Sequence, residues 1–526
     1  MTLNGHSLIA GKTTAGTGGT TYGMNPATNE QLEPAYSLLT EDQVKAATAA
    51  AAEAYPSFST LEPEIHAAFL EAVADNIEAI GEELITRAGQ ETGLPAARLQ
   101  GERARTTGQL RLFANMVRQG DFRGVRIDPA LPERTPLPRA DIRQRQIPLG
   151  PVAVFGASNF PFAFSTAGGD TASALAAGCP VVFKAHNAHP GTGELVGQAV
   201  VKAVKDFGLH PGVFALVYGP GASIGQALVA DPAIKAVGFT GSQAAGIALM
   251  RTAAARREPI PVYAEMSSLN PVFVFEGALK GDIDAVAQQY VTAVTGSSGQ
   301  LCTSPGLLFA PEGEAGDKLA AAVARAVSAC SGQTMLTEGI AGSWNAGTEA
   351  LGSATGVDLI GKGLEGATRN APAPAIFGTQ VRDFVTNHVL HEEIFGAASL
   401  VIRYTSSQDL IEAINRLEGQ LTASLQLTEQ DYPTAAPLIP VLEQKVGRII
   451  INGWPTGVEV GHAMVHGGPF PATSDSRTTS VGTLAINRFL RPVAYQNIPQ
   501  ELLPAPLQDE NPWKVNRLVD GKPEHG

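Results

Sequence analysis

Along roughly the first 120 residues, apolar side chains recur at the spacing of an α-helix. This pattern predicts one helix over about residues 62–87 and another over about 96–119. Ahead of them, Thr40 and Gln43 fit a capping box, in which two side chains satisfy free backbone groups at a helix start. The alanine-rich run 44–55 is therefore expected to form the helix behind that cap. Residues 122–145 are rich in Pro and Arg and follow no steady period, which predicts an extended arm or edge strands.

From Pro148 onward, short β-rich runs alternate with helical segments. The predicted strands of this region cover residues 152–155, 181–184, 214–218, 236–240, 262–266 and 272–275. Strands that alternate with helices at this pitch predict βαβ units, and hence a doubly wound parallel sheet with helices on both faces. A second α/β stretch starts near 282–294, and the tail after Arg488 is expected to return as an edge strand.

The composition predicts a globular protein without nucleic-acid or membrane partners. Hydrophobic residues make up 44% and charged residues 17% of the 526 positions, and this length favours about three or four domains. The net charge of −13, without a long Lys/Arg run, argues against binding to a phosphate backbone. No apolar run reaches the ~18–20 residues that span a bilayer. Three cysteines cannot form a disulfide framework and no secretory signal is visible, so a cytoplasmic location is expected.

Two glycine-bearing turns, 219–225 and 239–246, each follow a predicted strand and lead into a helix. Free N–H groups and the helix dipole attract anions at such a place. Neither turn has the G-x-G-x-x-G pattern, and an ordinary turn also uses glycine, so each alone leaves both interpretations open. Two of them in one βαβ series favour a nucleotide at the carboxyl edge of the sheet. Lys184 ends a strand at that edge, unless it is simply a surface lysine.

Three residues are candidates for covalent chemistry. Cys302 lies in a loop of small residues, so its thiol can face a cleft, whereas Cys179 and Cys330 are expected to be inert core residues. Glu265 ends an apolar strand and is either an ion-pair partner or a carboxyl with a raised pKa that suits a general base. Asn159 follows a strand and can donate to an oxyanion, or can simply cap a turn.

Taken together, these residues resemble the aldehyde dehydrogenase superfamily over nearly the whole chain. The motifs appear in family order as 158–162, 182–184, 239–242 with Gly246, Glu265, 299–300 with Cys302, and 392–396. The resemblance implies an α/β fold with a Rossmann-type cofactor domain, an α/β catalytic domain and a β oligomerisation arm. These parts are expected at 1–124 with 146–265, at 266–485, and at 125–145 with 486–510, in a homodimer or homotetramer.

The resemblance also implies roles for individual residues, and it implies no metal. Cys302 is the thiolate nucleophile, Asn159 and the Cys302 backbone N–H form the oxyanion hole, and Glu265 activates the water that hydrolyses a thioester. The expected cofactor contacts are Lys184, His186, Asn187, Gly225, Thr240, Gly241, Ser242, Gly246, Met266, Glu393 and Phe395.

Departures from the common family pattern bear on the coenzyme. Many members continue the strand-end lysine with Pro-Ser-Glu, whose glutamate holds the adenine ribose and favours NAD. Here Lys184 is followed by Ala185, His186 and Asn187. Asn187 has no carboxylate to repel a 2′-phosphate, and His186 can help to hold one, so NADP is slightly favoured and NAD stays open.

Other departures bear on the substrate. The segments 452–458 and 466–473 resemble the branch that contains α-ketoglutaric semialdehyde (2,5-dioxovalerate) dehydrogenases and NADP-linked fatty aldehyde dehydrogenases. Oxidation of 2,5-dioxovalerate to 2-oxoglutarate is the closer expectation. A fatty or broad-range aldehyde dehydrogenase is the first alternative, and a catalytically idle scaffold is the second.

A substrate with a carboxylate calls for an arginine in its pocket. Arg103, Arg105 and Arg111 lie on one predicted helix that can face the substrate tunnel, although each can equally be a solvated helix charge. The candidates for the apolar wall of the tunnel, with ordinary core packing as the alternative, are Phe160, Phe164, Trp454 and Phe470.

Overall fold

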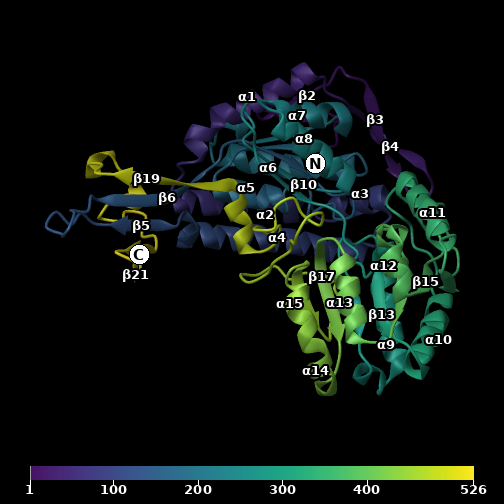
Figure 1. Ribbon diagram of the computed structural model, residues 1–526. Coiled ribbons are helices and arrows are strands. Elements are labelled where there is room, and N and C mark those ends of the chain that lie inside the picture. The colour runs from purple at the N-terminus through teal and green to yellow at the C-terminus, as the bar shows by residue number, and fades with distance from the viewer. Residues whose placement is uncertain (1) are drawn as a thin grey trace.

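The computed structural model describes residues 2–526, which form two α/β bodies and a projecting arm (Figure 1). The first body holds a seven-stranded sheet in the order β11-β10-β7-β8-β9-β1-β2. Its strands are β7 (Val152–Phe155), β8 (Val181–Lys184), β9 (Phe214–Val217), β10 (Ala236–Thr240), β11 (Val262–Glu265), β1 (Ser7–Ile9) and β2 (Lys12–Thr14). The five strands from β11 to β9 are parallel, which confirms the predicted doubly wound sheet.

Helices cover both faces of this sheet (Figure 1). They are α1 (Glu41–Phe58), α2 (Pro63–Ile80), α3 (Glu82–Thr92), α4 (Ala96–Gln119), α5 (Asp170–Ala177), α6 (Pro190–Asp206), α7 (Gln226–Ala230) and α8 (Gln243–Ala254). The predicted capping box at Thr40 and Gln43 is present at the start of α1. The single helix predicted over 62–87 is wrong, because Gly81 adopts φ 68° and divides it into α2 and α3. A left-handed backbone of this kind ends a helix and favours glycine.

The second body holds another seven-stranded sheet, in the order β14-β15-β16-β13-β12-β17-β18. Its strands are β12 (Val272–Val274), β13 (Leu307–Pro311), β14 (Asp358–Lys362), β15 (Ala375–Gln380), β16 (Ala398–Tyr404), β17 (Gln420–Gln426) and β18 (Val446–Ile451). All are parallel except the edge strand β14. Its helices are α9 (Ile283–Thr295), α10 (Glu314–Ser328), α11 (Glu338–Gly352), α12 (Val381–Thr386), α13 (Ser407–Arg416), α14 (Tyr432–Ala435) and α15 (Ile439–Leu442).

The arm is a five-stranded sheet in the order β19-β6-β5-β20-β21, and it extends to the left of both bodies in Figure 1. Its strands are β5 (Val125–Asp128), β6 (Ile142–Pro148), β19 (Leu490–Gln496), β20 (Arg517–Val519) and β21 (Lys522–Glu524). The last two strands lie beyond the segments predicted for the arm. A separate hairpin of β3 (Thr20–Asn25) and β4 (Glu30–Ser37) packs beside α3.

Arg488 anchors the root of the arm in the first body. It directly precedes Phe489 and β19, and its guanidinium donates to the carboxylate of Asp170 at the start of α5. Both side chains are at most 7% exposed. Burial raises the pKa of Asp170 even though Arg488 opposes the shift. The ion pair therefore joins the arm to the helix layer of the first sheet.

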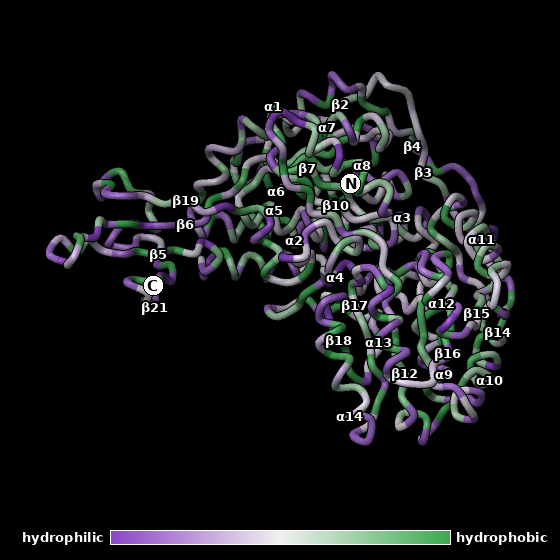
Figure 2. Tube along the Cα trace, viewed as in Figure 1, coloured by the Kyte–Doolittle hydropathy of each residue, from purple (hydrophilic) through white to green (hydrophobic). Residues whose placement is uncertain are grey.

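Hydrophobic positions concentrate along the strands inside both bodies (Figure 2). All residues of β7, β8 and β9 are buried, as expected for parallel strands covered on both faces. Cys179 is fully buried, in agreement with its expected core role, whereas Cys330 is half-buried at the end of α10. Within residues 2–526, no helix combines the length and the apolar character that a membrane crossing requires.

Candidate active site

A cavity of about 1080 Å³ lies where the carboxyl ends of the first sheet meet the second body. Residues just after β7, β8, β10 and β11 form one side of it, and the loop that carries Cys302 contributes to the other. Ligands of open α/β sheets bind at this edge because the strand ends and helix N-termini converge there.

The Cys302 loop is held in place by its neighbours. Ser297 and Ser298 adopt left-handed φ values of 56° and 57°, and Gly299 follows with φ 67°. A Cβ on Gly299 would lie 2.3 Å from the backbone of Gly396, so only glycine fits this close approach. On the far side, the Asn270 side-chain amide donates to the Cys302 carbonyl oxygen at 2.9 Å. These contacts fix the loop and leave the thiol half-buried at the cavity wall.

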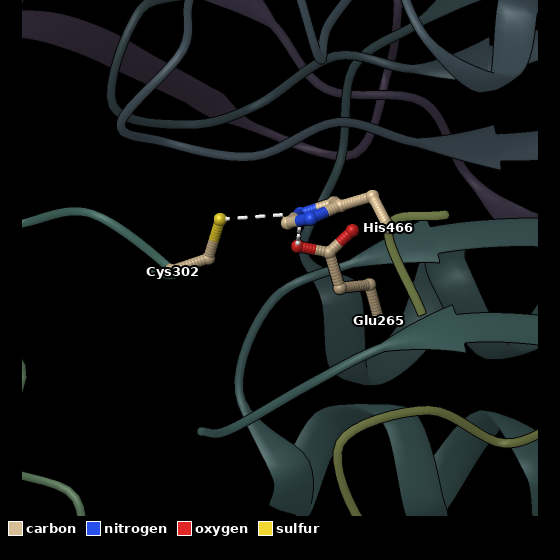
Figure 3. Close-up of side chains that lie close together, drawn as sticks. All are labelled: Glu265, Cys302 and His466. Carbon is tan, nitrogen blue, oxygen red and sulfur yellow. Dashed lines mark hydrogen bonds and ion pairs between the residues drawn. The ribbon is translucent and has the colours of Figure 1, made fainter. Parts of the chain in front are cut away.

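Cys302, Glu265 and His466 point toward one another (Figure 3). The Cys302 Sγ lies 3.4 Å from Nε2 of His466, and the same nitrogen lies 2.9 Å from Oε1 of Glu265. The Ser480 hydroxyl donates to the other carboxylate oxygen of Glu265 at 2.7 Å. Glu265 ends β11, and His466 comes from a buried loop whose backbone N–H donates to Thr479. A thiol, an imidazole and a carboxylate therefore share one small space.

The environment shifts the pKa values of Cys302 and Glu265 in opposite directions. Burial and the negative charge of Glu265 raise the pKa of the Cys302 thiol well above its ordinary value. Burial also favours the neutral form of Glu265, but His466 and the hydrogen bond from Ser480 outweigh it and hold the pKa below its usual range. The raised pKa considered for Glu265 is therefore wrong, since its hydrogen-bond donors stabilise the carboxylate.

The hydrogen-bond pattern assigns the tautomer of His466. Its Nδ1 is buried and has no partner, whereas Nε2 faces two acceptors. A buried N–H without a partner costs more than a buried lone pair, so the proton belongs on Nε2. His466 is then a donor that can stabilise either the carboxylate of Glu265 or a thiolate at Cys302.

Asn159 lies beside the nucleophile loop, as the resemblance implied. Its side-chain amide donates to the Gln300 carbonyl oxygen at 3.0 Å, and the residue is 6% exposed. An amide NH₂ carries two donors, so one N–H remains for an oxygen that develops charge near Cys302.

Most of the residues expected to bind the cofactor do line the cavity. They are His186, Asn187, Thr240, Gly241, Ser242, Met266, Glu393 and Phe395. Lys184, Gly225 and Gly246 do not line it. A Cβ on Gly225 would meet the Phe155 ring at 3.1 Å, and one on Gly246 would meet the Met266 sulfur at 2.7 Å. Both glycines serve close packing beneath the site.

Lys184 and His186 carry different charges. Burial lowers the pKa of Lys184 to about 8, and its Nζ donates to the Asn187 side chain at 2.8 Å. Burial, followed by the charges of His189 and Lys184, lowers the pKa of His186 well below its ordinary value, so its imidazole is neutral. Its Nδ1 accepts from the Ala188 N–H, which leaves Nε2–H as a donor toward a ligand. Burial raises the pKa of Glu393 to about 7, although Ser267 and Ser268 oppose the shift.

Of the three candidate arginines, one lies near the nucleophile. The Arg105 guanidinium stacks over the Phe164 ring at 5.6 Å, and that ring lies 6.3 Å from the His466 ring. Phe160 packs against Phe164 at 5.2 Å. The substrate contact predicted for Arg111 is wrong. Six residues of helix rotate it by about 240° from Arg105, and it pairs with Asp75 and Glu78 in solvent.

Two of the expected apolar wall residues also lie elsewhere. The Trp454 indole donates to Gln289 on α9 and packs 5.8 Å from Tyr290, on the core side of the second sheet. Phe470 is 53% exposed, and its neighbour Pro471 lines the cavity instead. Arg103 donates to the Gly81 carbonyl between α2 and α3.

His466 and Ser480 were not found from the sequence. They lie 201 and 215 positions from Glu265, so no local spacing connects them to it. The sequence did mark this region through the segment 466–473, which was noted for its resemblance to one branch of dehydrogenases and not for a catalytic histidine.

The comparisons with known proteins agree with this arrangement. A model of the aldehyde dehydrogenase family matches residues 14–469. The chain is 50% identical over 525 residues to alpha-ketoglutaric semialdehyde dehydrogenase 2 of Azospirillum brasilense, covering 100% of both chains. It is 47% identical over 519 residues to the alpha-ketoglutaric semialdehyde dehydrogenase of Acinetobacter baylyi, covering 98% of both chains.

A solved structure shares the fold. The crystal structure of 1-pyrroline-5-carboxylate dehydrogenase from Thermus with bound NAD superimposes with a TM-score of 0.78 at 22% identity, over 94% of this chain and 92% of that one. The family match spans the five parallel strands of the first sheet, all seven strands of the second sheet, and every residue of the Cys302 and Glu265 loops. This chain therefore belongs to the aldehyde dehydrogenase family.

Proposed function

We propose that this protein oxidises 2,5-dioxovalerate to 2-oxoglutarate with NAD or NADP, through a thioester on Cys302. The observation that carries the proposal is the thiol of Cys302 at the wall of a large cavity, beside His466 and the Glu265 carboxylate. The substrate comes from the names of the two relatives at 50% and 47% identity.

The residues that line the cavity or lie next to it fit a pyridine dinucleotide. Lys184 brings a cation, and His186 brings a free Nε2–H donor. The first turn of α8 adds backbone N–H groups behind Ser242, which suit a pyrophosphate. When bound, the coenzyme supplies the acceptor for the two electrons that leave the aldehyde carbon.

The chain's own residues account for the other steps. Glu265 lies close enough to the sulfur to take the thiol proton, and the Nε2–H of His466 stabilises the resulting thiolate. Sulfur then bonds to the aldehyde carbon, and the Asn159 amide donates to the alkoxide oxygen. After oxidation leaves a thioester, Glu265 passes the thiol proton to solvent and then removes a proton from water. The new C–O bond forms and the C–S bond breaks, so that the sulfur leaves as the thiolate that starts the next cycle.

The direct test is steady-state kinetics of 2,5-dioxovalerate with NAD and with NADP, beside a fatty aldehyde of eight or more carbons. We expect the highest kcat/KM for 2,5-dioxovalerate. A higher value for the fatty aldehyde would favour the alternative substrate class, and no turnover of either would favour an idle scaffold.

Asn187 offers a test of coenzyme choice. We expect Asn187→Glu to lower kcat/KM for NADP about tenfold more than for NAD. A carboxylate about 6 Å from a 2′-phosphate at an effective dielectric of about 40 costs about 1.4 kcal/mol. Asn187→Ala is the control, since it removes the Lys184 contact without adding a charge. If kcat/KM fell equally with NADP and NAD, Asn187 would not lie at the adenosine ribose.

His466 is expected to set the acid limb of the pH profile. Since His466 lowers the pKa of Glu265, His466→Ala lets that pKa rise, and the carboxylate is then lost at a higher pH. We expect the acid limb of kcat to move to higher pH and the rate of Cys302 alkylation at neutral pH to fall about 10–100-fold, as for a lost hydrogen bond to an anion. His466→Gln keeps a donor and should recover part of both. An unmoved pH limb in the alanine variant would contradict this role.

The expected location and assembly extend the same proposal. We infer a cytoplasmic homodimer or homotetramer that associates through the arm. Two hydrophobic side chains in or beside the arm support the inference, since Leu137 is 68% exposed and Leu502 is 73% exposed.

A further inference from the structure

Two arginines, one from each α/β body, hold the same short loop beside the nucleophile. Arg105 on α4 donates from Nη1 to the Val458 carbonyl oxygen at 2.5 Å. Arg448 on β18 donates from Nη1 to the Gly457 carbonyl oxygen at 2.7 Å and from Nη2 to that of Pro455 at 2.8 Å. The two guanidinium groups are therefore tied to neighbouring positions of one loop, although 343 residues separate them (448 − 105).

Neither guanidinium has an acidic partner. Across residues 2–526, no carboxylate oxygen lies within 4.0 Å of a nitrogen of either side chain, and the Nε of Arg448 is buried without a hydrogen bond. The buried carboxyls of Glu102 and Glu265 and the exposed carboxyl of Glu459 act on Arg105 only from farther away. Two part-buried cations without a directly paired carboxylate, one of them with a spare donor, form a site for an anion.

The contacts place Arg105 on the side of Cys302 that His466 occupies. Arg105 stacks on Phe164, Phe164 lies against His466, and His466 contacts the sulfur. Burial lowers the pKa of both arginines, and a negative charge on Cys302 opposes this shift in each of them. The expected coenzyme residues, such as Lys184 and Thr240, lie instead at the strand ends of the first sheet.

We propose that Arg105 and Arg448 together bind the α-keto acid end of the substrate and so determine specificity for it. This inference rests on the proposed function. The carboxylate of 2,5-dioxovalerate is separated from the aldehyde carbon by four carbon–carbon bonds, and its 2-oxo oxygen lies next to it. An arginine binds a carboxylate through two parallel N–H donors, and a second arginine can then donate to the keto oxygen. Arg105 was predicted from the sequence, whereas Arg448 was not.

The test compares substrates of the same length. Three five-carbon aldehydes are used: 2,5-dioxovalerate, 5-oxopentanoate without the keto group, and pentanal without either group. The variants are Arg448→Met and Arg105→Met, which keep most of the apolar stem. Arg111→Met is the matched control, because it lies on the same helix as Arg105 but faces solvent.

We expect each methionine variant at the site to lower the ratio of kcat/KM for 2,5-dioxovalerate to that for pentanal about 10–100-fold, mainly through KM. Arg111→Met should leave this ratio unchanged. The ratio of 2,5-dioxovalerate to 5-oxopentanoate should fall in at least one of the two variants, because an arginine that donates to the keto oxygen distinguishes these substrates. Lysine at either position should restore part of the loss.

Equal losses for 2,5-dioxovalerate and pentanal would overturn the inference, because the arginines would then only hold the 455–458 loop. Unchanged ratios in both variants would also overturn it. The proposed function fails on separate grounds, namely if the parental enzyme itself shows no preference for 2,5-dioxovalerate over pentanal.

Discussion

Cys302→Ala is expected to abolish aldehyde oxidation. Without the sulfur, no tetrahedral adduct forms, and loss of a nucleophile that acts with its neighbours costs at least about 10⁴-fold in kcat. Coenzyme binding should survive, because the dinucleotide residues Lys184 and Ser242 are untouched. The measurements are NAD(P)H formation in steady state and in a single turnover, together with a fluorescence titration of the reduced coenzyme.

Cys330→Ala is the matched control for that variant. Cys330 is also half-buried, but its thiol donates to the Ala326 carbonyl oxygen of α10, and it packs against the core of the second body. It should keep the parental rate. Aldehyde oxidation by Cys302→Ala above about one part in a hundred of the parental rate would exclude a covalent mechanism through this residue.

Glu265→Gln is expected to stop the reaction after its first half. Glutamine cannot take a proton from water, so a thioester should accumulate after one rapid release of NAD(P)H, and steady turnover should fall about 10²–10⁴-fold. The burst itself should be slower than in the parental enzyme, because Glu265 also lies within reach of the thiol proton. Stopped-flow recording of NAD(P)H formation separates the two phases.

Hydroxylamine provides a second measurement on the same variant. This strong nucleophile attacks a thioester without help from a general base, so it should restore turnover in Glu265→Gln and have little effect on Cys302→Ala. If the glutamine variant turned over at the parental rate, Glu265 would not be the base that hydrolyses the thioester.

Those parts of the fold that depend on neighbouring residues in the chain could be predicted from the sequence. Apolar strands that alternate with helices give the first sheet, and the cap at Thr40 gives the start of α1. The helix over 62–87 failed because Gly81 alone does not reveal a left-handed backbone. The strands β20 and β21 are short and partly exposed. The strand β20 pairs with β5 across nearly 400 residues and β21 pairs with β20, and no periodic pattern in the sequence indicates the pairing with β5.

The part of the site that could be predicted consists of the residues that the family resemblance identified. Cys302, Glu265 and Asn159 do lie together, although their roles remain predictions. Arg111 was a wrong choice. The three arginines on this helix point in different directions, and the sequence alone did not show which side of the helix faces the core. His466 and Arg448 depend on how a distant loop folds over the nucleophile, which their own sequence neighbours do not show.

The buried Arg488–Asp170 ion pair couples the stability of the first body to the segment that leads into β19. A truncated chain that stopped short of Arg488 would strand a bare carboxylate on α5, in a layer that excludes water. Removing one member of such a pair costs about 3–5 kcal/mol, a large share of a typical domain's stability. A version of this protein shortened before Arg488 would therefore have a damaged first body as well as an incomplete arm, and its behaviour would reflect both defects.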